Sequence, residues 1–479
     1  MISILKKKFV GDALIYSLYP IISKLLTFIL IPLYTSYLTP GDYGNLQYIL
    51  LFGAFLRSAS QMGLNSSFWK FRSENDMVKR NVALNLTINQ FAIGVFLLII
   101  YLLVASVFSN FDTISLFIAI YYGALVVKTF GENLLLFARA NFQAKKYLKI
   151  ILIQTFIIFI LNIVFVKYLE LNFQGIIYSY LISFSLIALI FYRSLIREFQ
   201  GGYNWSLSKK MISYGLPIMV GNIGLLILSL SDRWFIKHYN TDEELGLYSY
   251  GYKFADLILV FIVQVFNLSF IPLAWKIKKS ESAQHLLSEI RNLIYFLFPV
   301  LSFLSLGVIL CLAQIMTSDS SYMSGLNILC VIAISHVFYG FYLFHSLGLQ
   351  FANRTKIILI CNGIAVVLNI ILNILLIPQY GALGAAIATI TSYFIMLIVT
   401  LAYSQHYYPL RINFFKTILH FIVLGASVFT ITYVYNEITS TIWYKIVVSF
   451  IIALILMLIL LFTSGISRET FKKLSQIKP

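Results

Sequence analysis

Residues 11–44 are GDALIYSLYPIISKLLTFILIPLYTSYLTPGDYG, a long apolar segment that ends in a cluster of turn-forming residues. The apolar run extends from Phe9 to about Tyr37 and follows three consecutive lysines. The hydrophobic region of a signal peptide is only about 7–15 residues long, and no small-residue cleavage site ends this run. A helix of about 20 residues crosses the apolar core of a bilayer. We therefore expect this segment to be the first transmembrane helix.

The rest of the chain continues this pattern. Hydrophobic residues make up 60% of the 479 residues and charged residues 11%, whereas a soluble domain has about 25% charged residues. At about 20 residues a span, the length leaves room for about fourteen spans with short connections. The expected spans are 10–36, 45–66, 82–108, 114–138, 150–167, 173–192, 212–235, 247–272, 290–314, 325–350, 357–377, 381–404, 415–435 and 445–464. We predict an all-α polytopic membrane protein of about 14 transmembrane helices.

Lysine and arginine residues are concentrated in every second gap between the expected spans. Of the 35, 27 lie in one alternate set of gaps and at the two ends, three lie in the other set, and five lie within spans. Cytoplasmic loops of membrane proteins carry an excess of Lys and Arg. The alternation therefore predicts an even number of spans with both termini cytoplasmic. The same bias accounts for the net charge of +17, so that charge does not indicate binding to nucleic acid.

A weak internal repeat has a period of about 200 residues. Tyr16-Ser17-Leu18-Tyr19-Pro20 opens span one, and Tyr214-Gly215-Leu216-Pro217 opens span seven. Parallel repeats of this kind are typical of transporters, with the substrate path between the two halves. Chance similarity between hydrophobic segments is the alternative. We predict an N-lobe of helices 1–6 (residues 1–200), a C-lobe of helices 7–12 (201–410), and helices 13–14 with a cytoplasmic tail (411–479).

Charged side chains within the spans are the strongest candidates for a binding site. Each costs at least about 2.5–3.5 kcal/mol at the membrane centre, so such residues usually face the bundle interior or a water-filled cavity. The cations are Lys24, Arg57, Lys128, Arg233 and Lys253, and the anions are Glu132, Asp232 and Asp256. Lys128 and Glu132 are four residues apart, and Lys253 and Asp256 are three apart, so each pair shares a helix face. Structural ion pairs and side chains that extend to the membrane interface are the alternatives.

Two features refine this set. Lys24 lies near the middle of span one with no acid within a turn, which favours an anion site facing a cavity. Gln61 and Asn65 follow Arg57 at i+4 and i+8, and Asn81, Asn85 and Asn89 form a similar stripe on span three. Such amides could bind sugar hydroxyls along a lumen or hold helices together, and the second role is the more common.

Nothing in the sequence indicates an enzyme. The cysteines Cys311, Cys330 and Cys361 have no partner spacing, and the six histidines show no metal-ligand spacing. No catalytic grouping, paired-carboxylate site or phosphate loop stands out. We expect a secondary transporter with no cofactor.

The segments Gly11–Ser17 and Ile31–Gly44 resemble the start of bacterial polysaccharide transporters. These are the Wzx-type oligosaccharide flippases of the multidrug/oligosaccharidyl-lipid/polysaccharide (MOP) superfamily, which have a MATE-like fold. The resemblance extends to the architecture of the whole chain, with two six-span halves and two extra spans. Its motifs are specific only in the first 45 residues.

The resemblance implies export of an undecaprenyl-diphosphate-linked oligosaccharide from the cytoplasmic to the outer leaflet of the bacterial inner membrane. The oligosaccharide would be the repeat unit of an O-antigen, capsule or exopolysaccharide, and H⁺ or Na⁺ would drive alternating access. A polysaccharide polymerase and a chain-length regulator would be partners besides membrane lipids. Candidates for contacts with the diphosphate or sugars are Lys24, Arg57, Arg233, Lys128, Lys253, Gln61, Asn65 and Asn85. Candidates for ion coupling are Glu132, Asp232 and Asp256.

Other functions remain open at this stage. A MATE-type multidrug or cation antiporter would favour an acidic lumen, and the excess of embedded cations argues against it. A lipid II flippase also requires cations and fourteen spans. A membrane-bound polymerase or ligase of O-antigen would need a large outer loop, which the span pattern does not contain.

Overall fold

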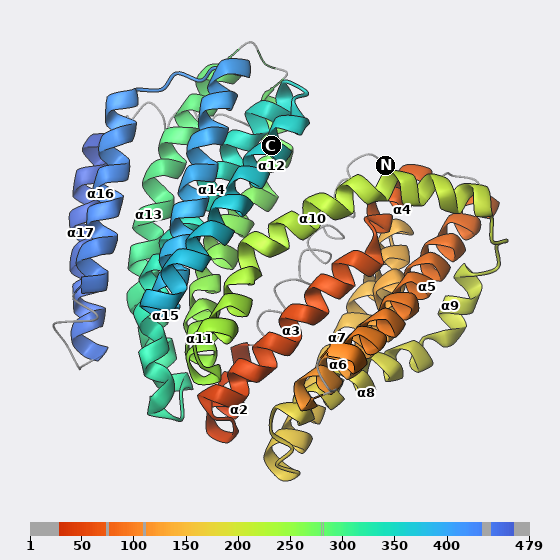
Figure 1. The fold of residues 1–479 in the computed structure, drawn as a ribbon. Helices are drawn as coiled ribbons and strands as arrows, with labels where there is room; N and C mark the ends of the chain where they lie inside the picture. The colour runs from red at the N-terminus through yellow and green to blue at the C-terminus, as the bar shows by residue number, and fades with distance from the viewer. Residues whose placement is uncertain are drawn as a thin grey trace. The chain divides into compact units, whose positions relative to one another are not determined.

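The computed structural model describes residues 28–72, 76–108, 112–278, 280, 282–433 and 442–463, and these residues form helices without a single strand. In the first half, the helices are α2 (Ile31–Tyr37), α3 (Pro40–Gln61), α4 (Leu64–Phe71), α5 (Asp76–Phe108), α6 (Thr113–Ala140), α7 (Ala144–Asn162), η1 (Ile163–Tyr168), α8 (Asn172–Ile190), α9 (Tyr192–Glu198) and α10 (Trp205–Tyr239). In the second half, they are α11 (Asp242–Ile258), η2 (Leu259–Gln264), α12 (Val265–Ile277), α13 (Ala283–Met316), η3 (Ser320–Ile328), α14 (Leu329–Phe351), α15 (Thr355–Tyr407), α16 (Phe414–Tyr433) and α17 (Ile442–Thr463) (Figure 1). The prediction of an all-α fold is confirmed.

Within the described ranges, nine helical stretches are long and apolar enough to cross a membrane, and α16 and α17 contain shorter apolar stretches. Each predicted span corresponds to a helix or helical stretch. Of the first span, the described residues include only its end, α2. Spans 357–377 and 381–404 both fall within α15, which is bent at Gly381. The protein is therefore a multi-pass membrane protein.

The sequence Thr39-Pro40-Gly41-Asp42 forms the start of α3. Thr39 is the N-cap residue: its side chain accepts a hydrogen bond from Asp42 N at 3.1 Å, and the Asp42 carboxylate accepts one from Thr39 N at 3.2 Å. This reciprocal pair is a capping box, which satisfies backbone donors that have no partner within the helix. Pro40 occupies the first turn, where its missing N–H costs no hydrogen bond. The turn at the end of the opening segment is therefore the start signal of the second span.

Helix α3 ends at a left-handed turn that lies against the backbone of α10. Met62 and Gly63 adopt left-handed backbone conformations, with φ of 44° and 62°. A Cβ atom on Gly63 would overlap the carbonyl oxygen of Gly215 in α10, and a Cβ atom on Gly215 would overlap the carbonyl oxygen of Met62. Ser67 Oγ also donates to Met211 O at 2.7 Å. The absence of side chains thus lets the α3–α4 corner approach the backbone of α10 closely.

A second glycine shapes the bend in α15. Gly381 has φ of 51° and ψ of −130°, a conformation that residues with a side chain rarely adopt. The N–H of the next residue, Ala382, donates to Glu244 Oε1 of α11 at 2.6 Å. Glu244 therefore satisfies a backbone donor that the bend removes from the helical ladder.

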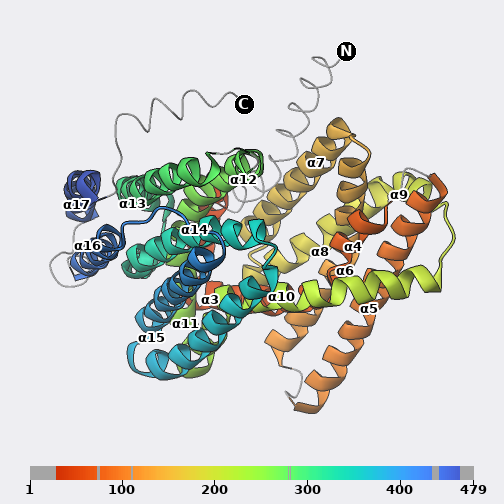
Figure 2. The same ribbon diagram turned by 90° about the horizontal axis from the view of Figure 1, so that it is seen from above.

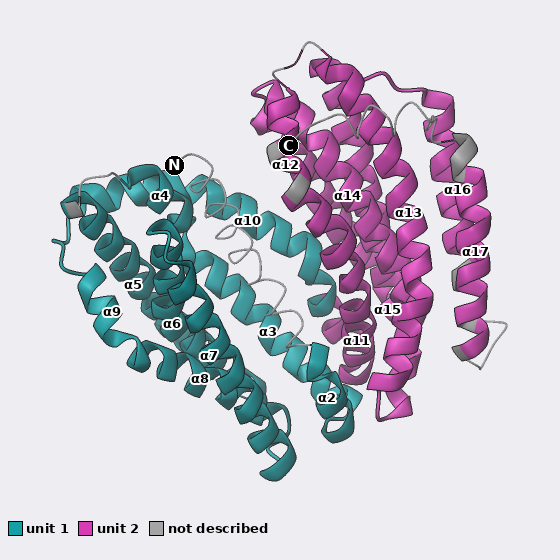
Figure 3. Cartoon of the chain, turned by 180° about the vertical axis from the view of Figure 1, so that it is seen from behind, with its two compact units in different colours: residues 1–234 teal, residues 235–479 magenta. Residues whose placement is uncertain are grey.

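The chain divides into two compact units, residues 1–234 and 235–479 (Figure 3). The first part of α10 belongs to the first unit, whereas the sequence analysis places the lobe boundary at residue 200. The predicted three-part division of the chain stays a prediction.

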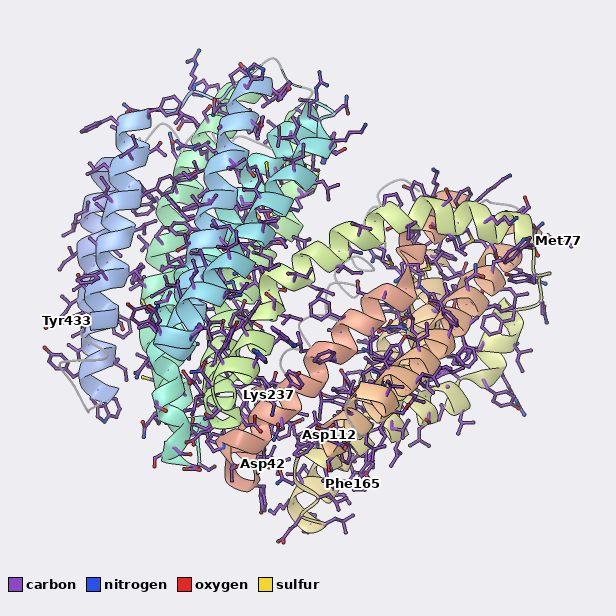
Figure 4. All side chains as sticks on the ribbon, in the orientation of Figure 1. Asp42, Met77, Asp112, Phe165, Lys237 and Tyr433 are labelled. Carbon is purple, nitrogen blue, oxygen red and sulfur yellow. The ribbon has the colours of Figure 1, made fainter. Side chains whose placement is uncertain are left out.

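Successive spans of the first unit place their connections at alternate ends. Asp42, at the start of α3, and Asp112, before α6, lie at one end of the unit, and Met77, at the start of α5, lies at the other (Figure 4). Asp42 and Asp112 belong to the cation-poor set of gaps and Met77 to the cation-rich set. This arrangement agrees with the alternation of charge along the chain.

Helix α14 is the most deeply buried of the nine candidate spans. It contacts α11, α13, α15 and α16 within the second unit. Helices α16 and α17 lie side by side at the rim of this unit (Figure 2). A polar residue on α14 is therefore removed from lipid, and its partners must come from the surrounding helices.

Candidate functional site

The first unit contains a cluster of charged and polar side chains between α3 and α6, which pack against each other (Figure 1). We call it the first-unit cluster, and its members are Arg57, Gln61, Lys128, Thr129 and Glu132. The carboxylate of Glu132 forms an ion pair with Arg57 and lies 3.1 Å from Lys128 Nζ. It also accepts a hydrogen bond from Gln61 Nε2 at 3.1 Å. Arg57 in turn donates to Thr129 Oγ1 at 2.7 Å.

Local helix geometry explains how these side chains meet. Lys128 and Glu132 lie one turn apart on α6, as predicted from their spacing. Arg57 and Gln61 are likewise one turn apart on α3, so both point at the same carboxylate. No spacing in the sequence pairs Arg57 with an acid, and the structure supplies Glu132 from α6.

Among the described residues of the first-unit cluster, two cations, Arg57 and Lys128, contact the single carboxylate of Glu132. The Arg57 side chain is 10% exposed, whereas Lys128 and Glu132 are 24% and 25% exposed. Among the described residues, Arg57 Nε has no hydrogen-bond partner. The cluster is therefore partly open and retains donor capacity for an additional anion.

Aromatic rings adjoin this cluster. Lys128 Nζ lies 5.2 Å from the centroid of the Phe184 ring on α8. Phe184 stacks against Tyr180 at 5.8 Å, and Tyr180 packs against Tyr121 of α6 at 5.7 Å. A cation beside aromatic faces and convergent polar groups is the typical composition of a small-molecule site.

The predicted polar stripe of the second span does not extend to Asn65. The helix breaks at Met62 and Gly63, so Asn65 lies on α4 rather than on the face shared by Arg57 and Gln61. There its side-chain oxygen accepts a hydrogen bond from Gln90 Nε2 of α5 at 3.0 Å. The left-handed turn is the physical reason for this difference.

The asparagine stripe of α5 holds the segment that leads into α10. Asn85 is buried, and its amide nitrogen donates to Asn81 O at 2.7 Å. Its oxygen accepts from Asn204 N at 3.2 Å and from Ser208 Oγ at 2.6 Å. Asn89 also bonds Ser208, at 3.0 Å. These contacts attach the start of α10 to the first unit, and a role for Asn85 in binding sugar stays a prediction.

Asp232 and Arg233 pair with each other near the end of α10. Arg233 Nη1 lies 3.4 Å from Asp232 Oδ1 and donates to Ser229 O at 3.1 Å. Asp232 is 2% exposed and Arg233 is 7% exposed. The pair is thus buried, and its charges compensate each other.

The second unit contains a different cluster, between α11 and α14. We call it the second-unit cluster, and its members are Tyr252, Asp256 and His336. His336 Nε2 lies 3.4 Å from Asp256 Oδ1, and the His336 ring meets Tyr252 edge-on with centroids 5.8 Å apart. His336 is 2% exposed, whereas the Asp256 side chain is 23% exposed. A direct pairing of Lys253 with Asp256 stays a prediction.

Lys24, the lysine predicted near the middle of span one, lies outside the described residues. Two buried residues that carry no sequence signal, His336 and Arg291, contact charged or polar groups in the second unit. His336 lies beside Asp256, and Arg291 is buried on α13, where it donates to Thr417 Oγ1 at 2.7 Å and covers the Tyr295 ring at 4.3 Å. Arg291 is the second residue of the predicted span 290–314, where its charge is assigned to the cation-rich gap before that span. No local signal marks His336, because its acid is on another helix.

Comparison with known families identifies the chain. The polysaccharide biosynthesis protein family matches residues 9–278, which is more than half of the sequence. It belongs to the polysaccharide biosynthesis protein family. A second family, MatE, matches residues 217–375. The predicted relationship to polysaccharide biosynthesis proteins and to the MATE family is therefore confirmed.

Curated relatives of this polysaccharide biosynthesis protein match part of its length. An uncharacterized membrane protein of Methanocaldococcus jannaschii is 30% identical over 191 residues, covering 39% of this chain and 44% of that protein. The probable low-salt glycan biosynthesis flippase Agl15 of Haloferax volcanii is 23% identical over 211 residues, covering 43% and 44%. The matched regions span less than half of each relative.

Solved structures share the fold over much more of the chain. An inward-facing multidrug resistance MATE family transporter of the MOP superfamily has a TM-score of 0.63 at 16% identity, covering 80% of this chain and 94% of that one. The lipid II flippase MurJ, in an inward closed conformation, has a TM-score of 0.61 at 17% identity, covering 97% and 100%. At these identities the similarity concerns the fold alone.

Proposed function

We propose that the protein is a flippase for a polyprenyl-diphosphate-linked oligosaccharide, which it moves from the cytoplasmic to the outer leaflet. The first-unit cluster carries this proposal. Its surplus cation and partial exposure suit an anionic ligand at a depth where charge is otherwise costly. Arginine also binds phosphate oxygens through two parallel hydrogen bonds, which makes Arg57 suited to a diphosphate.

Glu132 supports this assignment because it fills the cluster in the absence of substrate. It holds Arg57, Gln61 and Lys128 in place without neutralising both cations. A diphosphate that approaches Lys128 would compete with this carboxylate, and Glu132 could then change its charge or bind an ion. Glu132 therefore joins Asp232 and Asp256 as candidates for coupling transport to a gradient of H⁺ or Na⁺.

The aromatic rings beside the first-unit cluster are compatible with a glycan substrate. The Tyr121, Tyr180 and Phe184 rings provide apolar surface next to Lys128. Sugar rings combine apolar faces with hydroxyl groups, so they suit a site with aromatic surfaces and a few placed polar groups. Family membership and the glycan flippase relative favour the same substrate class.

The two cations of the first-unit cluster also bear on the two alternative functions, a multidrug or cation antiporter and a lipid II flippase. A carrier of cationic drugs would place acids in its site, whereas the first-unit cluster has two cations for one acid. A lipid II flippase would carry the same diphosphate chemistry with a different glycan. The substrate test below therefore compares these two lipid-linked glycans.

The test is complementation of a flippase-null strain by variants of the full chain, with membrane levels checked by immunoblot. We expect Arg57→Ala to abolish surface polysaccharide at normal protein levels. Arg193→Ala, which removes an exposed arginine outside the cluster, is the matched control and should complement fully. Complementation of a lipid II flippase-depleted strain by the wild type would reassign the glycan.

A charge-conserving variant separates binding from structural pairing. If Arg57 only balances the charge of Glu132, Arg57→Lys keeps that charge and should complement. If Arg57 binds the diphosphate through two parallel hydrogen bonds, Arg57→Lys should stay impaired although the charge of the cluster is unchanged. Full activity of Arg57→Ala, or full activity of Arg57→Lys, would overturn the proposal.

A further inference from the structure

A further buried polar cluster of the second unit surrounds the ring of Tyr295 on α13. We call it the Tyr295 cluster, and its members, from α13, α14 and α16, are Arg291, Tyr295, His345, Thr417 and His420. Each of these residues is at most 6% exposed. We propose that the cluster binds a phosphate group, which comes from a phospholipid headgroup or from free phosphate. This binding does not depend on the proposed flippase function, and the Tyr295 cluster shares no residue with the first-unit cluster.

Three helices converge on the Tyr295 ring. The Arg291 guanidinium covers the ring, with its carbon 4.3 Å from the centroid. The Tyr295 hydroxyl lies 3.0 Å from His345 Nε2 of α14, and the His420 ring of α16 packs against Tyr295 with centroids 5.4 Å apart. Arg291 Nη2 also donates to Thr417 Oγ1 of α16 at 2.7 Å. The five side chains therefore form one connected group inside the unit.

Three nitrogen atoms of this cluster have no hydrogen-bond partner among the described residues. They are Arg291 Nε, His345 Nδ1 and His420 Nε2. Buried polar atoms are normally hydrogen-bonded, so three such atoms around one ring indicate a site for a ligand. Arg291 Nε is always a donor, and His345 Nδ1 is a donor when the Tyr295 hydroxyl donates to Nε2. The cluster therefore offers donors to an acceptor from outside the chain.

The charge of Arg291 makes that acceptor an anion. A guanidinium keeps its positive charge in proteins, and its hydrogen bonds here go to neutral oxygens, Thr417 Oγ1 at 2.7 Å and Asn292 Oδ1 at 3.2 Å. No carboxylate among the described residues forms an ion pair with Arg291. Glu289 is two residues away on α13 and so lies on another face of the helix. A buried charge without a partner is costly, and a bound anion would remove that cost.

A pocket beside the Tyr295 cluster is partly open to the surface of the unit. It is lined by residues that include Leu287 of α13, His345 and Gly348 of α14, and Ser404 of α15. Leu287 is one turn before Arg291 on the same helix, and His345 belongs to both the pocket and the cluster. A ligand in this pocket therefore meets His345 and lies about one helical turn from Arg291.

The cluster lies near the cation-rich end of the second unit. Arg291 is in the third turn of α13, His345 is in the last two turns of α14, and Thr417 is in the first turn of α16. Each is thus within roughly 16 Å of the end of its helix, measured along the helix axis. The gaps that adjoin these three ends belong to the cation-rich set. Basic pockets between helices at such an end bind the headgroups of anionic lipids.

Phosphate matches the arrangement of these donors. A phosphate has several oxygen acceptors, so it can bind Arg291 of α13 and His345 of α14 at once. Arginine binds phosphate through directed hydrogen bonds, and Arg291 Nε is available for one without loss of the bond to Thr417. Phe415 and Ile418, which flank Thr417 on α16, are 76% and 58% exposed. They provide apolar surface for the acyl chains when the phosphate belongs to a lipid.

The first experiment measures thermal unfolding of the full-length protein in dodecyl maltoside. The probes are sodium phosphate, with sodium chloride at equal ionic strength as its control, and phosphatidylglycerol, with diacylglycerol as its control. We expect one of the two probes to raise the unfolding midpoint of the wild type by about 2 °C or more over its control. A rise with sodium phosphate assigns free phosphate as the source, and a rise with phosphatidylglycerol alone assigns the lipid headgroup. No rise with either probe overturns the proposal.

The second experiment repeats this measurement with variants. Arg291→Gln should lose the rise caused by the probe. Arg354→Gln is the matched control, because it removes an exposed arginine of the same unit that also covers a tyrosine ring, that of Tyr407 at 5.1 Å. It should keep the rise. Thr417→Val breaks the bond from Arg291 Nη2 but leaves Nε in place, so it should lower the midpoint without abolishing the rise.

A third variant decides the matter if Arg291→Gln does not fold. His345→Leu removes Nδ1 from both the pocket and the cluster and should at least halve the rise. A full rise in Arg291→Gln or in His345→Leu overturns the proposal. A loss of the rise in Arg354→Gln equal to that in Arg291→Gln overturns it as well, because the phosphate would then bind the cationic surface rather than the Tyr295 cluster.

Discussion

The first-unit and second-unit clusters occupy comparable places and have opposite chemistry. Helices α3 and α11 form the second and eighth spans, and α6 and α14 form the fourth and tenth, so the predicted repeat relates one helix pair to the other. In the first unit, a carboxylate is surrounded by Arg57, Gln61 and Lys128. In the second, His336 Nε2 lies 3.4 Å from Asp256 Oδ1 and makes no hydrogen bond to a described residue.

This difference separates two ways of keeping charge inside a membrane. The first-unit cluster uses permanent cations and a network of hydrogen bonds. The hydrogen bonds stabilise the cluster, and the cations favour the binding of anions. The second-unit cluster instead places a histidine, whose charge is not permanent, beside a carboxylate. We infer that the first arrangement, with its permanent cations, suits the binding of an anionic substrate.

Removing the central acid of the first-unit cluster should have the largest effect on stability. Glu132→Ala leaves two cations at membrane depth without their shared partner, and loss of one member of a buried pair costs about 3–5 kcal/mol. The measurement is the free energy of unfolding in detergent by titration with sodium dodecyl sulfate. Glu289→Ala removes a partly buried carboxylate that lies 3.9 Å from the exposed His285, and it should cost at most about 1 kcal/mol because the pair is long and His285 faces solvent. Equal losses for the two variants would show that the first-unit cluster is no firmer than a surface pair.

The hydrogen bond between Arg57 and Thr129 should have the next largest effect. Thr129→Val keeps the shape of the side chain and removes the acceptor that lies 2.7 Å from Arg57 Nη1. A hydrogen bond to a charged group contributes about 1.5–3 kcal/mol. Thr129→Ser retains the hydroxyl and should keep most of the stability in the same titration. A larger loss for Ser than for Val would assign the effect to packing.

Gln61 should contribute less. Its amide donates one of several hydrogen bonds to Glu132, so Gln61→Leu should lower the free energy of unfolding by about 1 kcal/mol. The same variant tests the substrate site, because it does not alter the charge of the cluster. Complementation should therefore be reduced less by Gln61→Leu than by Arg57→Ala. The reverse order would contradict the importance of the cations.

His336 should contribute least to stability although it is buried. Its Nε2 makes no hydrogen bond to a described residue, so His336→Gln should change the free energy of unfolding by about 1 kcal/mol or less. The measurement is the same titration with sodium dodecyl sulfate. A destabilisation as large as that of Glu132→Ala would show that the two clusters are equally structural.

Much of the first-unit cluster could be predicted because its signals are local. Lys128 and Glu132 are on one helix turn, as are Arg57 and Gln61, so their spacing indicates which side chains share a face. The contact between Arg57 and Glu132 joins residues 75 positions apart and has no local signal. Asn65 was placed on the wrong face because the left-handed turn at Met62 and Gly63 interrupts the helix.

The sequence by itself determined that this chain crosses a membrane many times, which loops share a side, and which charges lie within the spans. These properties depend on transfer from water to lipid, which acts on each segment separately. Only the tertiary structure decided that Arg57 meets Glu132, that Asn85 anchors the start of α10, and that His336 faces Asp256. Those contacts depend on the rotation and depth of helices that are distant in sequence. Hydropathy gives almost no information on the rotation or the depth of a helix, because a helix can turn about its axis without changing its length or composition.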